Sequence, residues 1–254
     1  MAEVEVSKTE IALENVIKTY GKSTALNVSF KIKEGKSLGI VGESGCGKST
    51  AANIAAGLIT PTKGRCTYNG KDLKNLKRQE SLEYRRNVQM VFQDYNAALN
   101  PRMTVGASIA EPIRNFIKPG KKEEKELAKQ MLKQIGLTEM DADRYPRAFS
   151  GGQRQRICIA RAIATSPKIL LLDEVTSNLD VSVQAQILNL LADLKKSQGM
   201  GMLLISHDIG VVRYMCDKIL VMYQGHVVEE LDSENLKNAK HPYTKQLLAS
   251  VPAI

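Results

Sequence analysis

The stretch SLGIVGESGCGKSTAANIAAGLI, residues 37–59, decides how this chain folds. Its first five residues, 37–41, form a short apolar run that is typical of a buried strand and stops at Gly42. A glycine-rich segment follows, and residues 48–59 have the composition of a helix. A strand, a glycine-rich turn and a helix in this order predict a loop whose backbone N–H groups turn inward around an anion.

The glycine-rich segment GESGCGKST fits the phosphate-loop pattern G-x-x-x-x-G-K-[ST]. Chance alone produces this pattern in about one chain in a hundred of this length, and the flanking strand and helix lower that rate. The helix N-terminus adds positive potential, Lys48 is expected to reach the β- and γ-phosphates, and the Ser49 hydroxyl is expected to bind Mg²⁺. We expect the whole loop to hold a nucleoside triphosphate: Gly42, Glu43, Ser44, Gly45, Cys46, Gly47, Lys48, Ser49 and Thr50.

A second apolar strand, ILLLDE at residues 169–174, ends in two carboxylates. In parallel sheets ligands bind at the carboxyl ends of the strands. Asp173 is therefore expected to hold Mg²⁺, directly or through water, and Glu174 to orient and deprotonate an attacking water. The alternative is that both are solvated carboxylates in a turn with no ligand. A phosphate loop earlier in the same chain argues against it.

The rest of the chain alternates buried strands with helices, which predicts an α/β fold: a P-loop NTPase core with a mainly parallel sheet. Residues 11–20 and 26–32 predict an N-terminal antiparallel β layer, and residues 103–165 predict an inserted helical subdomain. In that insert Leu127, Met131, Leu132 and Ile135 share one helix face, and Gly136 is a helix C-terminal cap. We expect one domain over residues 1–254, divided as follows: core and β layer about 8–98 and 166–232, helical subdomain about 99–165, and a short C-terminal segment 233–254.

Composition excludes several classes of protein. Hydrophobic residues make up 43% of the chain, which is ordinary for a globular protein. No apolar run approaches the ~18 residues of a membrane span, the first residues do not form a secretory signal, and the four cysteines have no metal or disulfide spacing. The formal net charge of +9 is spread along the chain, so it does not select a partner. A cytosolic location follows as the default.

The segment FSGGQRQR, residues 149–156, predicts a helix that starts on two glycines, with arginines close behind and no acidic residue. Such a helix end is suited to an anion. The sequence motifs SNLD (177–180) and HPYT (241–244) read as turn or capping segments when taken alone.

Taken together, these motifs resemble those of the ATP-binding-cassette ATPases over nearly the whole chain. FSGGQ is similar to the signature of that family, and SNLD is similar to the loop that runs along its dimer interface. The resemblance implies that Tyr20 stacks on adenine, that Gln93 senses the γ-phosphate and Mg²⁺ beside the transmembrane contact, and that His207 contacts the γ-phosphate. Taken one at a time, each of these residues has a simpler explanation as packing, surface or capping; their joint occurrence in order around a complete phosphate loop favours the resemblance.

The same resemblance implies that the ATP site is shared between two subunits. The phosphate loop of one subunit faces the signature helix of the other, so Ser150, Gly151, Gly152 and Gln153 are expected to contact the nucleotide of the partner. Lys48, Glu174 and His207 are the expected catalytic residues, and Ser49, Gln93 and Asp173 the expected Mg²⁺ ligands. The activity implied is hydrolysis of ATP to ADP and phosphate.

The segments ESGCGKST, VFQDYNAALNPRMTV and HPYTKQLLASVP resemble the cassettes of peptide and nickel importers. That resemblance implies a second, related ATPase subunit (a homodimer being the other arrangement), two transmembrane permease subunits, and indirectly an extracytoplasmic binding protein. It also implies a peripheral place on the cytoplasmic face of the cell membrane. SNLD is closer to the nickel or metallophore branch, so peptides and metal complexes both stay open as cargo.

Two other functions fit parts of the sequence. The net charge suits a soluble cassette ATPase that acts on nucleic acid in DNA repair or chromosome work, but the chain has neither sustained coiled-coil heptads nor a zinc-type cysteine insertion. A P-loop phosphotransferase has no use for SGGQ or for the His207 turn.

Overall fold

A computed structural model of the chain describes residues 9–21, 23–177 and 179–249. Ten strands form one sheet in the order β5-β4-β1-β2-β10-β9-β3-β8-β7-β6. The strands are β1 (Glu10–Tyr20), β2 (Ser23–Lys33), β3 (Ser37–Val41), β4 (Lys63–Tyr68), β5 (Lys71–Asp72), β6 (Val88–Val91), β7 (Ile169–Asp173), β8 (Gly201–Ser206), β9 (Lys218–Tyr223) and β10 (His226–Asp232). The helices are α1 (Lys48–Ala55), α2 (Arg78–Asn87), α3 (Tyr95–Ala98), α4 (Val105–Pro112), α5 (Lys121–Gln134), α6 (Gly151–Ile163), α7 (Val181–Gln198), α8 (Ile209–Met215) and α9 (Pro242–Ala249).

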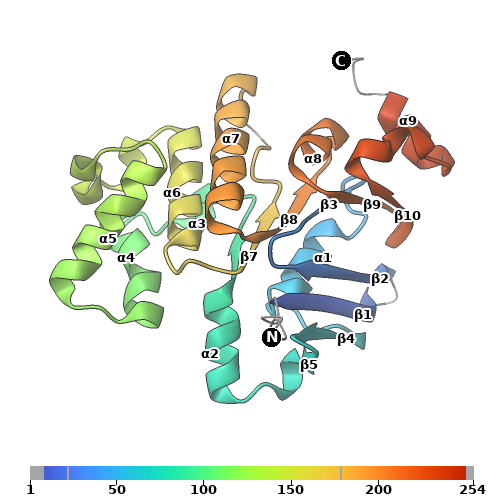
Figure 1. Ribbon diagram of the computed structural model, residues 1–254, viewed down its shortest axis with the longest axis horizontal. Coiled ribbons are helices and arrows are strands. Elements are labelled where there is room, and N and C mark those ends of the chain that lie inside the picture. Colours follow the sequence, from blue (N-terminus) through green and yellow to red (C-terminus); the bar gives the residue numbers. More distant parts are fainter. Residues whose placement is uncertain (1–8, 22, 178, 250–254) are drawn as a thin grey trace, which may run out of the picture.

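The sheet has a parallel part and an antiparallel part, as the sequence predicts. Strands β6, β7, β8, β3 and β9 are parallel neighbours, whereas β2, β1, β4 and β5 pair antiparallel. β10 joins the two parts, because it is antiparallel to β9 and bridges β2 at a single residue pair. Figure 1 shows the antiparallel strands at one side of the molecule and the helices of the middle of the chain at the other.

Strands β3, β7 and β8 of the parallel part are buried at every residue because both of their faces are covered. Ile169 and Leu171 of β7 belong to a core that includes α1, β1 and β2, whereas Leu170 and Leu172 belong to the core formed with α6, α7 and α8. Side chains alternate across a strand, so a strand covered on both faces loses the polar half of the usual pattern. Helix α1 is thereby enclosed between the parallel strands and the antiparallel layer, and it contacts β1, β2, β7 and β8.

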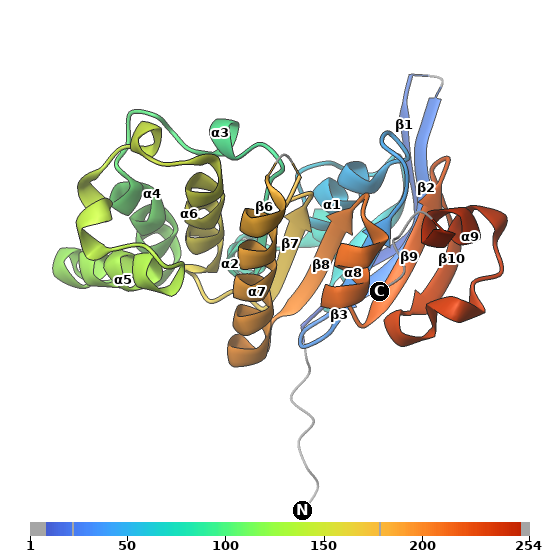
Figure 2. The same ribbon diagram turned by 90° about the horizontal axis from the view of Figure 1, so that it is seen from above.

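Between β6 and β7 the described chain forms helices and no strand, and α4, α5 and α6 pack against one another (Figures 1 and 2). The expected helix face is confirmed, since Leu132 and Ile135 are fully buried and Leu127 and Met131 pack against the same cluster. Gly136 follows the C-cap with φ of 75°, as expected of a glycine that ends a helix.

Some elements differ from the sequence prediction. Helix α1 ends at Ala55 rather than near residue 59, because Gly57 is left-handed and the N–H groups of Leu58 and Ile59 turn back to the Asn53 carbonyl. Strands β4 and β5 and helix α2 were not predicted. The first half of β4 is exposed and polar, so this strand has no apolar pattern that would reveal it.

No helix in the described ranges combines the length and the apolar character needed to cross a bilayer.

The double covering of the parallel strands gives a stability prediction. Leu171→Ala should lower the free energy of unfolding by about 2–5 kcal/mol, because it leaves a cavity beside α1 that close-packed neighbours do not fill. Leu82→Ala on α2, where the leucine is 50% exposed, should change it by no more than about 0.5 kcal/mol. Urea denaturation measures both values, and equal small losses would contradict this description of the core.

Candidate functional site

The phosphate loop connects the buried strand β3 to helix α1 at the carboxyl edge of the parallel sheet. Helix α1 begins at Lys48 with no side-chain cap and no acidic residue in its first turn, so its N-terminal N–H groups and positive dipole end stay available to an anion. A cavity of about 250 Å³ lies over this helix end. Its lining residues are Ala25, Ser44, Gly45, Gly47, Lys48, Ser49, Thr50, Gln93 and Glu174.

At two positions of the loop only glycine fits, because a neighbouring backbone carbonyl lies where a Cβ atom would be. Gly47 has φ of 100°, and a Cβ there would lie 2.4 Å from the Ala25 carbonyl oxygen. A Cβ at Gly42 would lie 2.1 Å from the Met222 carbonyl oxygen. The loop is therefore fixed against β2 on one side and β9 on the other.

Lys48 is only 4% exposed. Its Nζ donates to the carbonyl oxygens of Gly42 and Glu43, each at 2.8 Å, and lies 4.0 Å from Glu174 Oε1. A buried ammonium is tolerated only where it is paired in this way. The lysine charge is consequently held inside the curve of the loop, where phosphate oxygens would lie.

Of the two carboxylates at the end of β7, Glu174 lines the cavity and Asp173 does not. Asp173 is buried, and its Oδ1 accepts a hydrogen bond from the Ser49 hydroxyl at 3.0 Å. Burial raises the pKa of Asp173, the neighbouring Glu174 charge adds to the rise, and the Ser49 hydrogen bond and Lys48 oppose it.

Glu174 has φ of 46°, a left-handed conformation that is uncommon outside glycine and that often marks a functional position. Its Oε2 accepts from Gln93 Nε2 at 2.8 Å, and its backbone carbonyl accepts from the Ser177 hydroxyl at 2.7 Å. The structure thus brings Gln93, from the loop after β6, to the carboxylate that follows β7.

The residues around Ser49 suit Mg²⁺. A serine hydroxyl and a carboxylate already contact one another, and the amide oxygen of Gln93 is not engaged by Glu174. Magnesium in phosphate-transfer sites takes few protein ligands and fills its other positions with phosphate and water. Within the described residues no cluster of three or more His, Cys, Asp or Glu side chains would build an all-protein metal site instead.

The signature segment starts α6 as expected, and its glycines have a packing role as well. The Ser150 hydroxyl accepts from the Gln153 N–H at 3.3 Å, and Gln153 Oε1 accepts from the Ser150 N–H at 2.9 Å, which is a capping box. A Cβ on Gly152 would lie 2.3 Å from Val183 Cγ1 of α7. None of Ser150, Gly151, Gly152 or Gln153 is among the described residues that line the phosphate-loop cavity of the same chain.

Tyr20 and His207 also lie outside the lining of that cavity, among the residues described. Tyr20 ends β1, is 52% exposed, and has Lys18 Nζ 5.3 Å from its ring centroid. His207 is exposed directly after β8. Both are accessible to a ligand that extends beyond the loop.

In SNLD, Asn178 lies outside the described residues, and the rest has the turn and cap geometry that the sequence allows. The Asp180 carboxylate caps α7 by accepting from the Val183 N–H at 2.9 Å, and the Ser182 hydroxyl bond holds the pKa of Asp180 below its usual range.

Three contacts near the site were not predicted. Arg154 of α6 lies over the Tyr95 ring at 5.5 Å, and Arg161 Nη1 donates to the Ala98 carbonyl at 2.5 Å, so helix α3 just after Gln93 is fastened to the signature helix. The Tyr243 hydroxyl accepts from the Glu43 N–H at 2.9 Å. The segments that hold most of these residues, VFQDYNAALNPRMTV, FSGGQRQR and HPYT, stand out in the sequence, but the sequence does not show which distant residues they contact.

Comparisons with known proteins agree with this geometry. A family model described as ABC transporter matches residues 25–177. The oligopeptide transport ATP-binding protein OppF of Salmonella typhimurium is 47% identical over 227 residues, which cover 89% of this chain and 68% of that protein. The di/tripeptide transport ATP-binding protein DppF of Pseudomonas aeruginosa is 45% identical over 241 residues, which cover 94% of this chain and 75% of that protein.

Among solved structures, a dimeric ATP-binding cassette in a post-hydrolysis state, bound to ADP and Pi, superposes with a TM-score of 0.78 at 35% identity. The match covers 88% of this chain and 98% of the other. The expected fold class is confirmed. With a phosphate loop, a paired Asp-Glu strand end and the family match in agreement, the chain belongs to the ABC transporter family and is one of its ATP-binding, ATP-hydrolysing cassettes.

Proposed function

We propose that this chain is the ATPase subunit of a membrane importer and that the cargo is peptide. The observation that carries the ATPase role is that Lys48, Ser49, Gln93 and Glu174 line the same cavity. The peptide cargo is supported by relatives that are named oligopeptide or di/tripeptide transport ATP-binding proteins. Nickel and metallophores, the other cargo expected from the sequence, receive no such support.

The site residues divide the work of hydrolysis. Lys48 and the N–H groups at the start of α1 bind the β- and γ-phosphates, and the exposed ring of Tyr20 stacks on adenine. Ser49, Asp173 and Gln93 hold Mg²⁺, which neutralises charge on the phosphate oxygens when it is bound. Glu174, held by Gln93, takes a proton from water as its oxygen attacks the γ-phosphorus, and the bond to the bridging oxygen breaks to leave ADP and phosphate. His207 contacts the γ-phosphate.

The signature helix acts on the nucleotide of a second subunit. Its N-terminus carries no acidic residue in the first turn and lies outside the loop cavity of its own chain. Ser150, Gly151, Gly152 and Gln153 therefore close over ATP bound to the partner. ATP stabilises the closed pair and hydrolysis releases it, so the two states exchange as a population shift.

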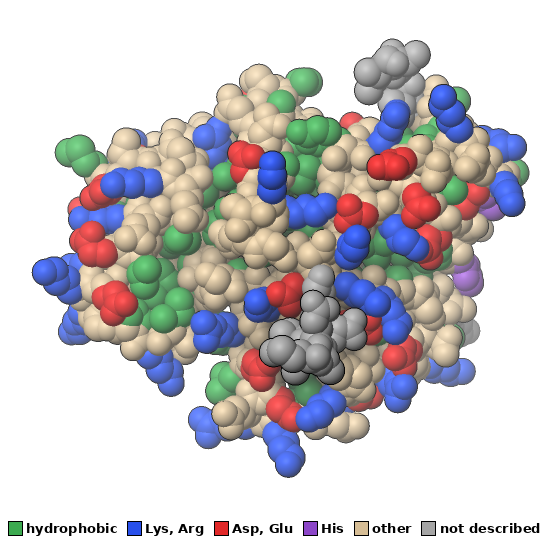
Figure 3. Space-filling view, viewed as in Figure 1, with side chains coloured by type: hydrophobic (Ala, Val, Ile, Leu, Met, Phe, Trp, Pro, Cys, Tyr) green, Lys and Arg blue, Asp and Glu red, His purple; other side chains and the backbone are tan. Residues whose placement is uncertain are grey.

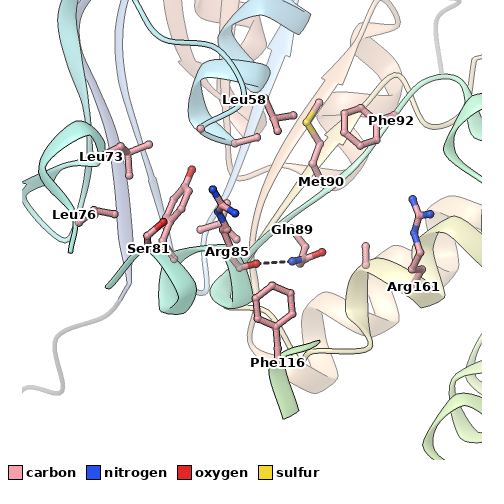
Figure 4. Close-up of a pocket in the computed structure, with 15 residues that line it drawn as sticks. Leu58, Leu73, Leu76, Ser81, Arg85, Gln89, Met90, Phe92, Phe116 and Arg161 are labelled. Carbon is pink, nitrogen blue, oxygen red and sulfur yellow. Dashed lines mark hydrogen bonds between the residues drawn. The ribbon is translucent and has the colours of Figure 1, made fainter. Parts of the chain in front are cut away.

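A groove beside the core is suited to the permease. It has a volume of about 530 Å³, and Figure 4 shows Leu58, Met90 and Phe92 along it, together with Phe116 and Arg161 of the helical region. Phe92 and Leu58 are exposed apolar side chains, which mark contact sites in soluble domains. Phe92 directly precedes Gln93, so a permease segment seated here is one residue away from the side chain that holds Glu174.

The assembly that follows has two permease subunits and two cassettes, the second cassette being a related chain, on the cytoplasmic face of the cell membrane. An extracytoplasmic binding protein delivers the cargo. Within the chain, residues 99–165 serve as the helical subdomain that carries the signature, and residues 8–98 and 166–232 serve as the nucleotide-binding core. A nucleic-acid role is not favoured, since acidic and basic side chains are interspersed over the face in Figure 3 and form no single-sign stripe there.

Lys48→Ala should reduce ATP hydrolysis by at least about a hundredfold, because it removes the one buried cation of the loop. Steady-state release of phosphate measures this, with the exposed Lys74→Ala as control. Near-normal turnover in Lys48→Ala would remove the assignment of this cavity as the ATP site.

Glu174→Gln should slow hydrolysis by about 10²–10⁴-fold while ATP binding persists, because the amide cannot accept the proton of the attacking water. Dimers should accumulate with ATP in this variant, as measured by size-exclusion chromatography with light scattering. Hydrolysis at the unmodified rate would show that another group is the base.

Ser150→Arg should abolish ATP-driven dimerisation, since it places a bulky side chain where the γ-phosphate of the partner has to lie. Ser150→Ala is the matched comparison, because it removes the cap of α6, worth about 0.5–2 kcal/mol in stability, and the hydroxyl that faces the partner's nucleotide but adds no bulk, so dimerisation should persist in weakened form. Full activity in Ser150→Arg would contradict a site shared between two chains.

A further inference from the structure

The start of the last helix contacts the phosphate loop, although it is about 200 residues away in the chain. Tyr243 is the second residue of α9 and is 8% exposed. Its ring packs on Tyr223, at the end of β9, with 4.5 Å between centroids and 36° between planes. The ring contact explains the burial of Tyr243 but not the position of its hydroxyl.

That hydroxyl accepts a hydrogen bond from the Glu43 N–H at 2.9 Å. The Glu43 nitrogen and the Gly42 carbonyl belong to one peptide unit, and the Gly42 oxygen accepts from Lys48 Nζ at 2.8 Å. The same planar group is therefore held at its nitrogen end by Tyr243 and at its oxygen end by Lys48. Hydrogen bonds linked through one polar group polarise and strengthen each other.

The tyrosine is itself held in place from two directions. His241 Nδ1 accepts from the Tyr243 N–H at 3.3 Å. Glu229 of β10 accepts from the N–H groups of Lys240 at 2.6 Å and His241 at 3.2 Å. Burial raises the pKa of Tyr243, so its hydroxyl stays neutral at ordinary pH. A fixed neutral acceptor is thus presented to the loop by β10 and the first turn of α9.

We propose that Tyr243 is a positioning residue for nucleotide binding: its hydroxyl orients the Gly42–Glu43 peptide, and that peptide orients the ammonium of Lys48 toward the phosphates. This inference rests on the proposed role of Lys48 as a phosphate ligand. It assigns the HPYT segment a place in the ATP site, through Lys48 and without direct contact with ATP.

The test compares two tyrosines of the same ring pair in the full chain. Tyr243→Phe removes the hydroxyl on the loop, whereas Tyr223→Phe removes a hydroxyl that accepts from the exposed Gln224 amide at 3.3 Å. Calorimetric titration with ADP, which avoids turnover, should give a Kd about two- to tenfold weaker for Tyr243→Phe and unchanged for Tyr223→Phe. The KM for ATP should rise by the same factor, with kcat within about twofold, and melting temperatures establish that both variants are folded.

A double-mutant cycle with Lys48→Ala tests the path through the lysine. If Tyr243 acts by orienting Lys48, Tyr243→Phe should weaken ADP binding less than about twofold once Lys48 is absent. A second variant, Glu229→Ala, removes the acceptor that holds the N–H groups before α9 but keeps the Tyr243 hydroxyl. It should also weaken ADP binding, as Tyr243→Phe does.

The outcomes separate this inference from the proposed function. Unchanged ADP binding in Tyr243→Phe, equal losses in the two tyrosine variants, or the same loss with and without Lys48 would each overturn the positioning role. Unchanged ADP binding in Lys48→Ala alone would instead overturn the proposed ATP site. A loss confined to Tyr243→Phe and dependent on Lys48 supports both.

Discussion

The buried charge of Lys48 is the constraint on which the rest of the structure depends. An ammonium in a closed interior needs several oxygen partners, and Lys48 finds them in the carbonyls of Gly42 and Glu43 and in the nearby Glu174 carboxylate. Those partners belong to the ends of β3 and β7, two strands of the parallel sheet that are separated by β8. The strand order, the curl of the sheet around α1 and the glycines of the loop all serve to bring these groups within reach.

The segment that follows β6 connects the site to two other parts of the molecule. Gln93 joins Glu174 to the segment that follows β6, whose Phe92 opens into the groove of Figure 4. Tyr95, two residues further on, lies against the signature helix through Arg154. A shift of this short segment would therefore move Glu174, the groove lining and α6 together, and a shared element of this kind can couple binding at one surface to chemistry at another.

Much of the fold was predictable because it follows from local pattern. Strands covered on both faces are mostly apolar, as β7 is over residues 169–172, and the order of strand, glycine-rich turn and helix predicts that Lys48 and Ser49 lie together at a helix start, where they line a cavity with Glu174. What could not be predicted depends on distant partners. Any side chain at position 152 would clash with Val183 of α7. The Tyr243 hydroxyl accepts a hydrogen bond from Glu43, which is far away in the sequence. The first half of strand β4 is exposed and polar, so the composition of this strand has no period that distinguishes it from a loop.

The central claim is that this ATPase drives a membrane permease seated in the groove beside Phe92. The most direct measurement is to tag the chain in its native cell, cross-link from a photoreactive residue at position 92, solubilise the membranes gently and identify the products. The account predicts a cross-link to a polytopic membrane protein, together with co-purification of a second, related ATPase. Cross-links to soluble proteins or nucleic acid alone would contradict the transport role, and the chemistry at Lys48 and Glu174 would then need another purpose.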